Sequence, residues 1–217
     1  MRKIVKFIIV ILLFLGLISF IFKGEENVFS GTLTRSSSLT LVNKDNPIED
    51  NYNVDDLTTP NVRFAKACKG EEKKMKQEAA IALESLFKGA KKDNITLYAN
   101  SGYRTGKTQE SIYKKTVRNK GKAYANAFVA SRGHSEHETG LAMDVTNSNR
   151  NFHKKSSEAK WIRENAHKYG FILRYPENKE NVTGYSYEPW HIRYVGDSIS
   201  KKIYKKGITL EEYIQGE

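Results

Sequence analysis

The chain has 217 residues, with 36 lysines and arginines against 25 acidic residues, so its formal net charge is +11. This length favours a single domain of ordinary size, and the charge suits an anionic partner such as the polymers and lipids of a cell envelope. The single cysteine, Cys68, excludes an intramolecular disulfide, and no aromatic-interleaved basic motif of the RNA-binding kind appears. We therefore expect no nucleic acid as a partner.

The N-terminus combines a basic start with an apolar run. Arg2, Lys3 and Lys6 precede 16 uncharged, almost wholly apolar residues from Phe7 to Phe22. The run ends in "IFK", without the small-x-small site at which a secretory signal peptide is cleaved, so we favour an uncleaved signal anchor over a cleaved signal peptide. The positive-inside rule leaves the basic end in the cytoplasm and the rest of the chain outside.

This pattern predicts three parts. Residues 1–23 form a cytoplasmic tail and transmembrane helix, residues 24–39 a polar extracellular stalk, and residues 40–217 the functional domain. Exported domains that fold without disulfides are common on bacterial surfaces. We expect a single-pass protein of the bacterial cell membrane whose domain lies outside the cell and acts as a monomer.

Short apolar periodicities predict the first elements of the domain. "LTLVN" (39–43) is compatible with a short strand that already belongs to the domain. A helix is predicted over 71–91, because apolar residues recur there with helical spacing. They are Met75, Ala79, Ala82, Leu83, Leu86 and Phe87. "ITLYAN" (95–100) is rich in strand formers and predicts a strand that ends shortly before Arg104.

Further helices and strands alternate along the rest of the domain without a regular βαβ order. Helices are predicted over 108–119 and 157–169, ended by Gly121 and Gly170, with a short helix near 123–129. "GFILRY" (170–175) and "WHIRYVG" (190–196) read as strands. The mixture favours an α+β fold, a small and mainly antiparallel sheet flanked by helices, which the transmembrane helix precedes.

Two histidines and one aspartate stand out as candidate metal ligands. "GLAMDV" alternates, so that Asp144 projects from one face of a strand together with small neighbours. His137 lies seven residues earlier, and Gly140 between them lets the backbone turn back. His191 begins a later strand in "EPWHIRY". Two histidines and a carboxylate form a common three-ligand set that leaves zinc an open position.

Two further residues suit catalysis and substrate binding. Glu188 lies three residues before His191, with Pro189 between them, and is a candidate general base for an attacking water. Arg104, just past a strand, is a candidate for binding an anionic group, since its planar guanidinium can hold a carboxylate through two hydrogen bonds. A structural ion pair is the alternative for Arg104.

Other titratable residues receive weaker readings. His134 and His137 form a His-x-x-His pair, but the glycines and serine around them indicate a loop, where this spacing does not place two ligands together. His153 and His167 are interpreted as surface or structural residues. Glu136 and Glu138 are interpreted as solvated residues or as support for the ligands, and both readings remain open.

Three blocks of this sequence resemble the VanY-type D-alanyl-D-alanine carboxypeptidases, within a larger group of zinc peptidases that includes lysostaphin-like enzymes and the hedgehog signalling domain. The first is "SGYRT....Q...Y" over 101–113. The second is the Ser-x-His-x-x-Gly-x-Ala-x-Asp pattern, which fits 135–144 at every fixed position. The third is "GFILRYPENKENVTGYSYEPWHIRYVG" over 170–196. The resemblance covers roughly residues 40–200.

The resemblance implies zinc ligands at His137, Asp144 and His191 and a catalytic base at Glu188. It also implies substrate roles. Arg104 would bind the free C-terminal carboxylate of a peptidoglycan stem peptide, with Gln109 and Ser135 as supporting contacts and Trp190 as a wall of the pocket. Simple packing is the alternative for Trp190.

The activity implied is a zinc-dependent carboxypeptidase that removes the C-terminal D-alanine from peptidoglycan stem peptides. One rival is an L,D-carboxypeptidase that shortens the tetrapeptide to a tripeptide. Another is a zinc-bearing wall-binding module without catalysis, because hedgehog domains show that this fold can serve as a ligand. The intact Glu188 and ligand set favour an enzyme.

Overall fold

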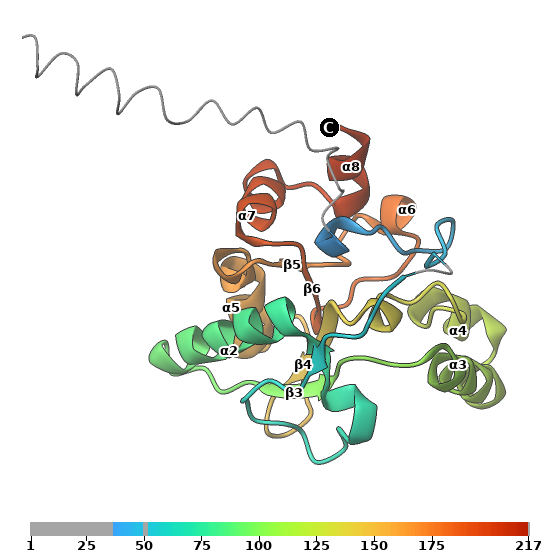
Figure 1. Ribbon diagram of the computed structural model, residues 1–217, viewed down its shortest axis with the longest axis horizontal. Coiled ribbons are helices and arrows are strands. Elements are labelled where there is room, and N and C mark those ends of the chain that lie inside the picture. The colour runs from blue at the N-terminus through green and yellow to red at the C-terminus, as the bar shows by residue number, and fades with distance from the viewer. Residues whose placement is uncertain (1–36, 50–51, 217) are drawn as a thin grey trace, which may run out of the picture. The chain divides into compact units, whose positions relative to one another are not determined.

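The computed structural model describes residues 37–49 and 52–216 (Figure 1). Residues 36–217 form one compact unit. The predicted tail, transmembrane helix and most of the stalk therefore lie outside the described residues. Within the described ranges, no helix is both long and apolar enough to cross a membrane.

A four-stranded antiparallel sheet lies at the centre of the domain. Its strands are β3 (Tyr98–Ser101), β4 (Ala142–Thr146), β5 (Phe171–Leu173) and β6 (His191–Tyr194), in the spatial order β3-β4-β6-β5. Figure 1 shows helices around this sheet, with α2 and α5 near one end of the view and α3 and α4 near the other. The predicted α+β class with a small antiparallel sheet is confirmed.

The remaining helices differ in how well the sequence predicted them. The predicted helices at 108–119, 123–129 and 157–169 are present, with bounds shifted by a few residues, and the last ends in a 3-10 turn before Gly170. Three C-terminal helices, α6, α7 and α8, had not been predicted. In chain order these elements are α3 (Gly106–Lys120), α4 (Lys122–Phe128), η3 (Glu136–Thr139), α5 (Ser157–Asn165), η4 (Ala166–Tyr169), α6 (Glu180–Thr183), α7 (Asp197–Lys206) and α8 (Leu210–Gln215).

The helix predicted from residue 71 begins later. A 3-10 turn, η2 (Gly70–Lys73), and a short strand, β2 (Met75–Lys76), precede α2 (Gln77–Lys92), and β2 pairs with β1 (Leu57–Thr58). The backbone oxygens that a helix would use accept instead from the loop after β3: Gly102 N–H donates to Glu72 O at 2.6 Å and Tyr103 N–H donates to Lys74 O at 2.8 Å. Hydrogen bonds to a loop that is distant in sequence therefore keep residues 71–76 out of the helix that their apolar spacing predicts.

The strand predicted at 39–43 is also absent from the described structure. A 3-10 turn, η1 (Ser37–Leu39), is followed by chain without regular secondary structure. The backbone oxygens of Ser38 and Thr40 accept from the buried guanidinium of Arg193, at 3.1 and 2.7 Å. A side chain therefore occupies acceptors that a neighbouring strand would need. The segment still belongs to the domain, since Val42 is fully buried.

The strands divide their side chains between an apolar and a polar face. On β4 and β6, Met143, Val145 and Ile192 pack into the main hydrophobic core against α2. The alternate residues Asp144 and His191 point to the opposite face, as the period of two in a strand requires. A smaller core joins the end of the sheet to α7 and α8, around Ile172, Val195, Ile203 and Leu210.

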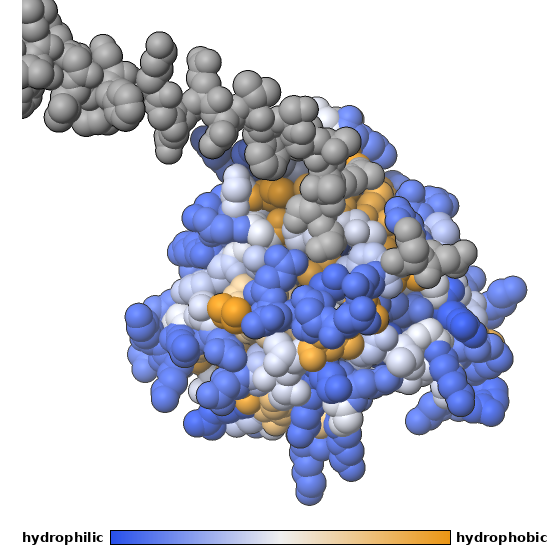
Figure 2. All heavy atoms as spheres, viewed as in Figure 1, coloured by the Kyte–Doolittle hydropathy of each residue, from blue (hydrophilic) through white to orange (hydrophobic). Residues whose placement is uncertain are grey.

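The surface agrees with this division. Figure 2 shows a face that is mostly hydrophilic, with smaller apolar areas between the charged side chains. Among the described residues, only a few large apolar side chains are exposed, namely Ile81, Tyr124, Val182 and Tyr204. The apolar faces of the helices and the sheet thus pack against one another. The polar face of β4 and β6, which carries Asp144 and His191, is not part of the hydrophobic core.

Candidate metal centre and active site

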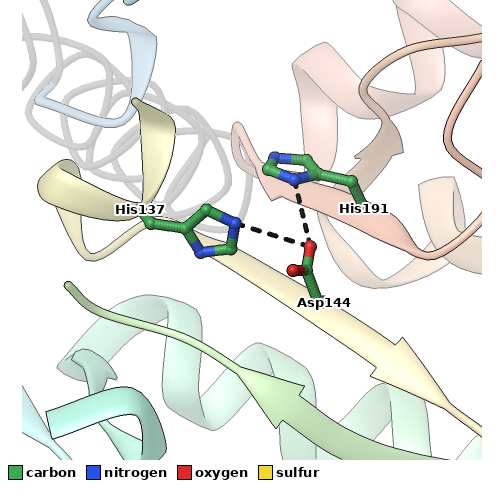
Figure 3. A group of neighbouring side chains, drawn as sticks. All are labelled: His137, Asp144 and His191. Atoms are coloured by element: carbon green, nitrogen blue, oxygen red, sulfur yellow. Dashed lines mark ion pairs between the residues drawn. The ribbon is translucent and has the colours of Figure 1, made fainter. Parts of the chain in front are cut away.

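The pairing of β4 with β6 brings two of the three predicted ligands together. Asp144 and His191 are direct partners across the two strands, so their side chains lie side by side on the polar face. His137 arrives from η3, because Gly140 adopts a left-handed conformation (φ 72°) that turns the chain from η3 into β4. Figure 3 shows the two imidazoles converging on the carboxylate of Asp144.

The distances among these side chains fit a zinc ion. Asp144 Oδ1 lies 3.4 Å from His137 Nε2 and 3.1 Å from His191 Nδ1. Two ligand atoms, each about 2 Å from a tetrahedral zinc, lie about 3.3 Å apart. Asp144 Oδ1 is buried, yet neither nitrogen makes a well-aligned hydrogen bond to it. A buried acceptor without a donor, facing two ring nitrogens, is the arrangement expected of metal ligands.

In each histidine, a hydrogen bond to the ring nitrogen that points away from Asp144 determines which nitrogen faces the candidate metal position. His137 Nδ1 lies 2.8 Å from Gly102 O, which can only accept, so Nδ1 carries the proton and the lone pair of Nε2 is free. His191 Nε2 lies 3.3 Å from Glu136 Oε2. That carboxylate accepts in the same way and turns His191 Nδ1 toward Asp144. Such outer hydrogen bonds are typical of histidines that bind metals.

The protonation of the two histidines differs in the absence of a metal. Burial lowers the pKa of His137 to about 4, with the nearby Arg104 acting in the same direction. For His191, burial also acts to lower the pKa, but the carboxylates of Asp144 and Glu136 outweigh it and raise the pKa to about 9. Zinc binding must therefore displace a proton from the His191 side of the site.

Glu188 lies beside the ligand group. Its side chain is almost fully buried, and Oε2 is 3.8 Å from His191 Nδ1. Burial raises the pKa of Glu188 to about 8, against the opposing influence of His191. A buried carboxyl group next to the candidate metal position lies where a general base is needed.

Arg104 extends the polar group on the other side of Asp144. It donates from Nε to Ser101 Oγ at 3.0 Å, from Nη1 to Gln109 Oε1 at 3.0 Å, and from Nη2 to Asp144 Oδ2 at 3.2 Å. A guanidinium has five N–H donors, so two remain. The Arg104 side chain is 12 % exposed and lines the same cleft as the ligands.

The other predicted substrate residues also line this cleft, in different settings. Gln109 is buried and uses both ends of its amide within the protein, since it also donates to Ala130 O at 2.7 Å. Ser135 Oγ accepts from the backbone N–H of His137 at 3.3 Å, which caps η3. Trp190 is partly buried, and its backbone oxygen accepts from Val145 N–H.

The cleft encloses about 230 Å³ and has an apolar wall as well as the polar group described above. Ile112 of α3 and Tyr124 and Phe128 of α4 form this wall, which the sequence did not indicate. A second cavity of about 260 Å³, between η4, β5 and α7, contains none of the three ligand residues. We place the site in the first cavity, because the titratable groups converge there.

His134 lies outside the ligand group, and its Nδ1 hydrogen-bonds with Asn43 O at 2.8 Å. Glu136 and Glu138 are not solvated: both are buried, and Glu136 contacts His191. Glu136 is the functional residue that sequence reasoning left undecided. A signal was available in "FILRY" and "HIRY", because Arg174 and Arg193 stand among buried apolar residues and a buried arginine requires a buried acid.

Comparisons with known proteins agree with this site. The family described as VanY, D-alanyl-D-alanine carboxypeptidase, matches residues 72–197, and the chain belongs to this family. The putative carboxypeptidase YodJ of Bacillus subtilis is 44% identical over 182 residues, which cover 82% of this chain and 67% of that protein.

Two solved structures are similar to the domain. The LD-carboxypeptidase LdcB is 44% identical, with a TM-score of 0.74, over 81% of this chain and 84% of the other. A mutant of the vancomycin resistance D,D-pentapeptidase VanY, solved in complex with Zn(II), is 36% identical, with a TM-score of 0.71, over 82% of this chain and 99% of the other. The presence of Zn(II) in that complex agrees with the fit of the His137, Asp144 and His191 group to zinc.

Proposed function

We propose that this chain is a zinc-dependent D-alanyl-D-alanine carboxypeptidase that removes the C-terminal D-alanine from peptidoglycan stem peptides. The observation that carries the proposal is the convergence, in one cleft, of the His137, Asp144 and His191 group with Glu188 and Arg104. Membership of the VanY family and the Zn(II) complex of a relative support the same reading.

The chain's own residues have separate tasks in the reaction. When bound, zinc supplies a Lewis acid that polarises the scissile carbonyl and favours ionisation of water. Glu188, which lies beside the three ligand residues, takes a proton from the attacking water and returns it to the departing amine of D-alanine. Burial of the Glu188 carboxyl keeps this proton from bulk solvent.

Arg104 selects a substrate with a free C-terminus. Its two remaining N–H donors suit a carboxylate, and its other three are held by Ser101, Gln109 and Asp144, so the guanidinium cannot swing away. A peptide without that carboxylate leaves these donors unpaired in a buried site, which opposes binding. Gln109 holds the Arg104 guanidinium in place by accepting a hydrogen bond from it. Ser135 Oγ accepts from His137 N–H, so its own hydroxyl proton can be donated to the substrate.

An L,D-carboxypeptidase is the second candidate, and the similarity to LdcB, 44% identical over most of both chains, favours it. Both reactions release a C-terminal D-alanine and use the same groups. They differ in the residue before the scissile bond. The relative turnover of pentapeptide and tetrapeptide distinguishes the two.

The direct test of function is incubation of the purified, zinc-loaded chain with pentapeptide, tetrapeptide and cross-linked muropeptides. We expect release of D-alanine from the pentapeptide and retention of the cross-links, because the donor stem of a cross-link presents no free carboxylate to Arg104. Faster cleavage of the tetrapeptide would assign L,D-specificity. Failure to release D-alanine from any of the three would refute the carboxypeptidase.

We also propose where the domain works. Residues 1–23 serve as a cytoplasmic tail and transmembrane anchor, residues 24–39 as a stalk, and residues 40–217 as a monomeric domain outside a bacterial cell. The basic start followed by an apolar run supports the anchor, and the extracellular position of peptidoglycan suits it. Fractionation tests it: the full chain is expected with the membranes, and a chain beginning at residue 36 in the soluble fraction.

A further inference from the structure

Glu136 lies next to a metal ligand in the sequence and behind another one in space. Its carboxylate is 1% exposed. Oε2 lies 3.3 Å from Nε2 of His191, on the side of the imidazole away from the candidate metal position. Oε1 accepts from Arg174 Nε at 2.7 Å and from Arg193 Nη1 at 2.6 Å. One carboxylate therefore joins the ring of His191 to two buried arginines.

This contact determines how the His191 ring is turned. The ring binds metal through Nδ1 only if Nε2 carries the proton and the ring does not rotate about its bond to Cβ. A carboxylate has no proton to donate here, so it accepts from Nε2–H and selects that tautomer. It also holds the ring in the orientation that faces Nδ1 toward Asp144, 3.1 Å away.

The two arginines are themselves held from outside the site. Arg174 donates from Nη1 and Nη2 to both oxygens of Glu211 in α8, at 2.9 and 2.6 Å. Arg193 donates from Nη2 to the backbone oxygens of Ser38 and Thr40. Both guanidinium groups are fully buried, and the two acids balance their charge. A buried network with every charge paired leaves Glu136 little freedom to move.

We propose that Glu136 is a positioning residue for the metal centre: its carboxylate, fixed by Arg174 and Arg193, holds His191 with Nδ1 toward the metal. The inference deepens the proposed function, on which it rests only to the extent that the site binds zinc. The rival explanation is that the network stabilises the fold and has no effect on His191.

Two matched substitutions separate these explanations. Glu136→Gln and Glu211→Gln are isosteric, and each removes one carboxylate from Arg174, but only Glu136 contacts His191. The dissociation constant for zinc is measured on the full chain by competition with a chromophoric chelator, and the stability of the metal-free chain is followed by urea denaturation. The second measurement reports damage to the fold independently of the metal.

We expect Glu136→Gln to weaken zinc binding by about 10- to 100-fold, the usual effect of losing a hydrogen-bond partner behind a ligand, whereas Glu211→Gln keeps zinc affinity close to that of the wild type. Both variants are expected to lose stability. Wild-type zinc affinity in Glu136→Gln, or an equal loss in both variants, would overturn the positioning role.

The wild-type chain provides a second test that needs no variant. In the zinc-loaded protein, nitrogen NMR of the His191 ring must show the Nε2–H tautomer, with its proton shifted downfield by the carboxylate. An Nδ1–H tautomer contradicts the inference even if Glu136→Gln does not fold. Zinc-loaded wild-type protein that releases no D-alanine would refute the proposed function, while the zinc affinities would still test Glu136.

Discussion

Arg104 combines two functions at the scale of a single residue. It donates a hydrogen bond to Asp144, a candidate zinc ligand, and in the proposed function it would offer its unused N–H donors to the substrate carboxylate. We expect Arg104→Lys to lower kcat/KM for a peptide with a free C-terminus by about 10- to 100-fold, because hydrogen bonds to charged groups contribute roughly 1.5–3 kcal/mol and an ammonium cannot bind two oxygens in one plane.

The same peptide with an amidated C-terminus is the control for Arg104→Lys. The wild-type enzyme should strongly prefer the free acid, and the variant should discriminate less, at unchanged zinc content per chain. Equal preference in both proteins would show that another group binds the carboxylate.

Glu188 is assigned the proton transfers and no part in holding the metal. We expect Glu188→Ala to lower kcat by about 10²- to 10⁴-fold, the usual contribution of general acid–base catalysis, while the chain retains one zinc. Metal analysis of the purified variant and turnover of the pentapeptide are the measurements. Wild-type turnover would remove Glu188 as the base, and loss of zinc would make it a ligand instead.

At the scale of elements, the loop after β3 supports the site through a glycine. Gly102 O accepts from His137 Nδ1, and a Cβ at Gly102 would lie 2.5 Å from Lys74 O and 2.8 Å from Met143 Cε. We expect Gly102→Ala to cost about 1–3 kcal/mol in the free energy of unfolding and to weaken zinc binding, because the loop must shift away from the backbone of Lys74 and from β4.

Gly121→Ala is the control for this loop. Gly121 has a positive φ of 87°, but a Cβ there meets nothing within 4 Å. The backbone strain of an alanine at this φ, about 1–3 kcal/mol, should reduce stability without changing zinc affinity. Urea denaturation and chelator competition measure the two quantities. If both variants kept the wild-type zinc affinity, the loop would have no part in positioning His137.

Elements with a clear local signal could be predicted from the sequence. The alternation in "GLAMDV" placed Asp144 on the polar face of β4, and Gly121 and Gly170 ended helices where expected. The start of α2 was predicted wrongly, because residues 72 and 74 hydrogen-bond with a loop that is distant in sequence. No local periodicity contains that information.

The site, too, could be predicted from the sequence only as far as local patterns and the family resemblance reach. The residue types and the family pattern indicated His137, Asp144, His191 and Glu188, and the structure brings these four together. The arginines in "FILRY" and "HIRY" indicated a buried acid, but its identity as Glu136 could not be derived, because Arg174 follows β5, Arg193 lies in β6, and Arg174 is held in turn by α8. Burial of a charge depends on long-range contacts, which a spacing argument does not contain.

At the scale of the whole molecule, the buried charges tie the two ends of the domain to its centre. Glu211 of α8 holds Arg174 and also accepts from Asn43 Nδ2 at 3.0 Å. We expect Glu211→Gln to lower the free energy of unfolding by about 3–5 kcal/mol, because it leaves a fully buried guanidinium short of a partner. Urea denaturation with a chelator present measures this without the contribution of zinc.

Lys201→Ala is the control for that prediction. Lys201 pairs with Asp197 at 2.7 Å in α7, but both side chains are more than half exposed. Such a pair contributes about 0–1 kcal/mol, so this variant should unfold close to the wild type. Similar losses in the two variants would mean that burial of the network adds nothing to stability.

The central claim is that this chain uses zinc at the His137, Asp144 and His191 group to remove D-alanine from a stem peptide. The most direct measurement is D-alanine release from pentapeptide by the full chain, first as purified, then after chelation and dialysis, and finally with zinc restored. We expect release by the purified chain, loss of release after chelation, and recovery once about one zinc per chain is restored. Undiminished release by the chelated, zinc-free protein would contradict it.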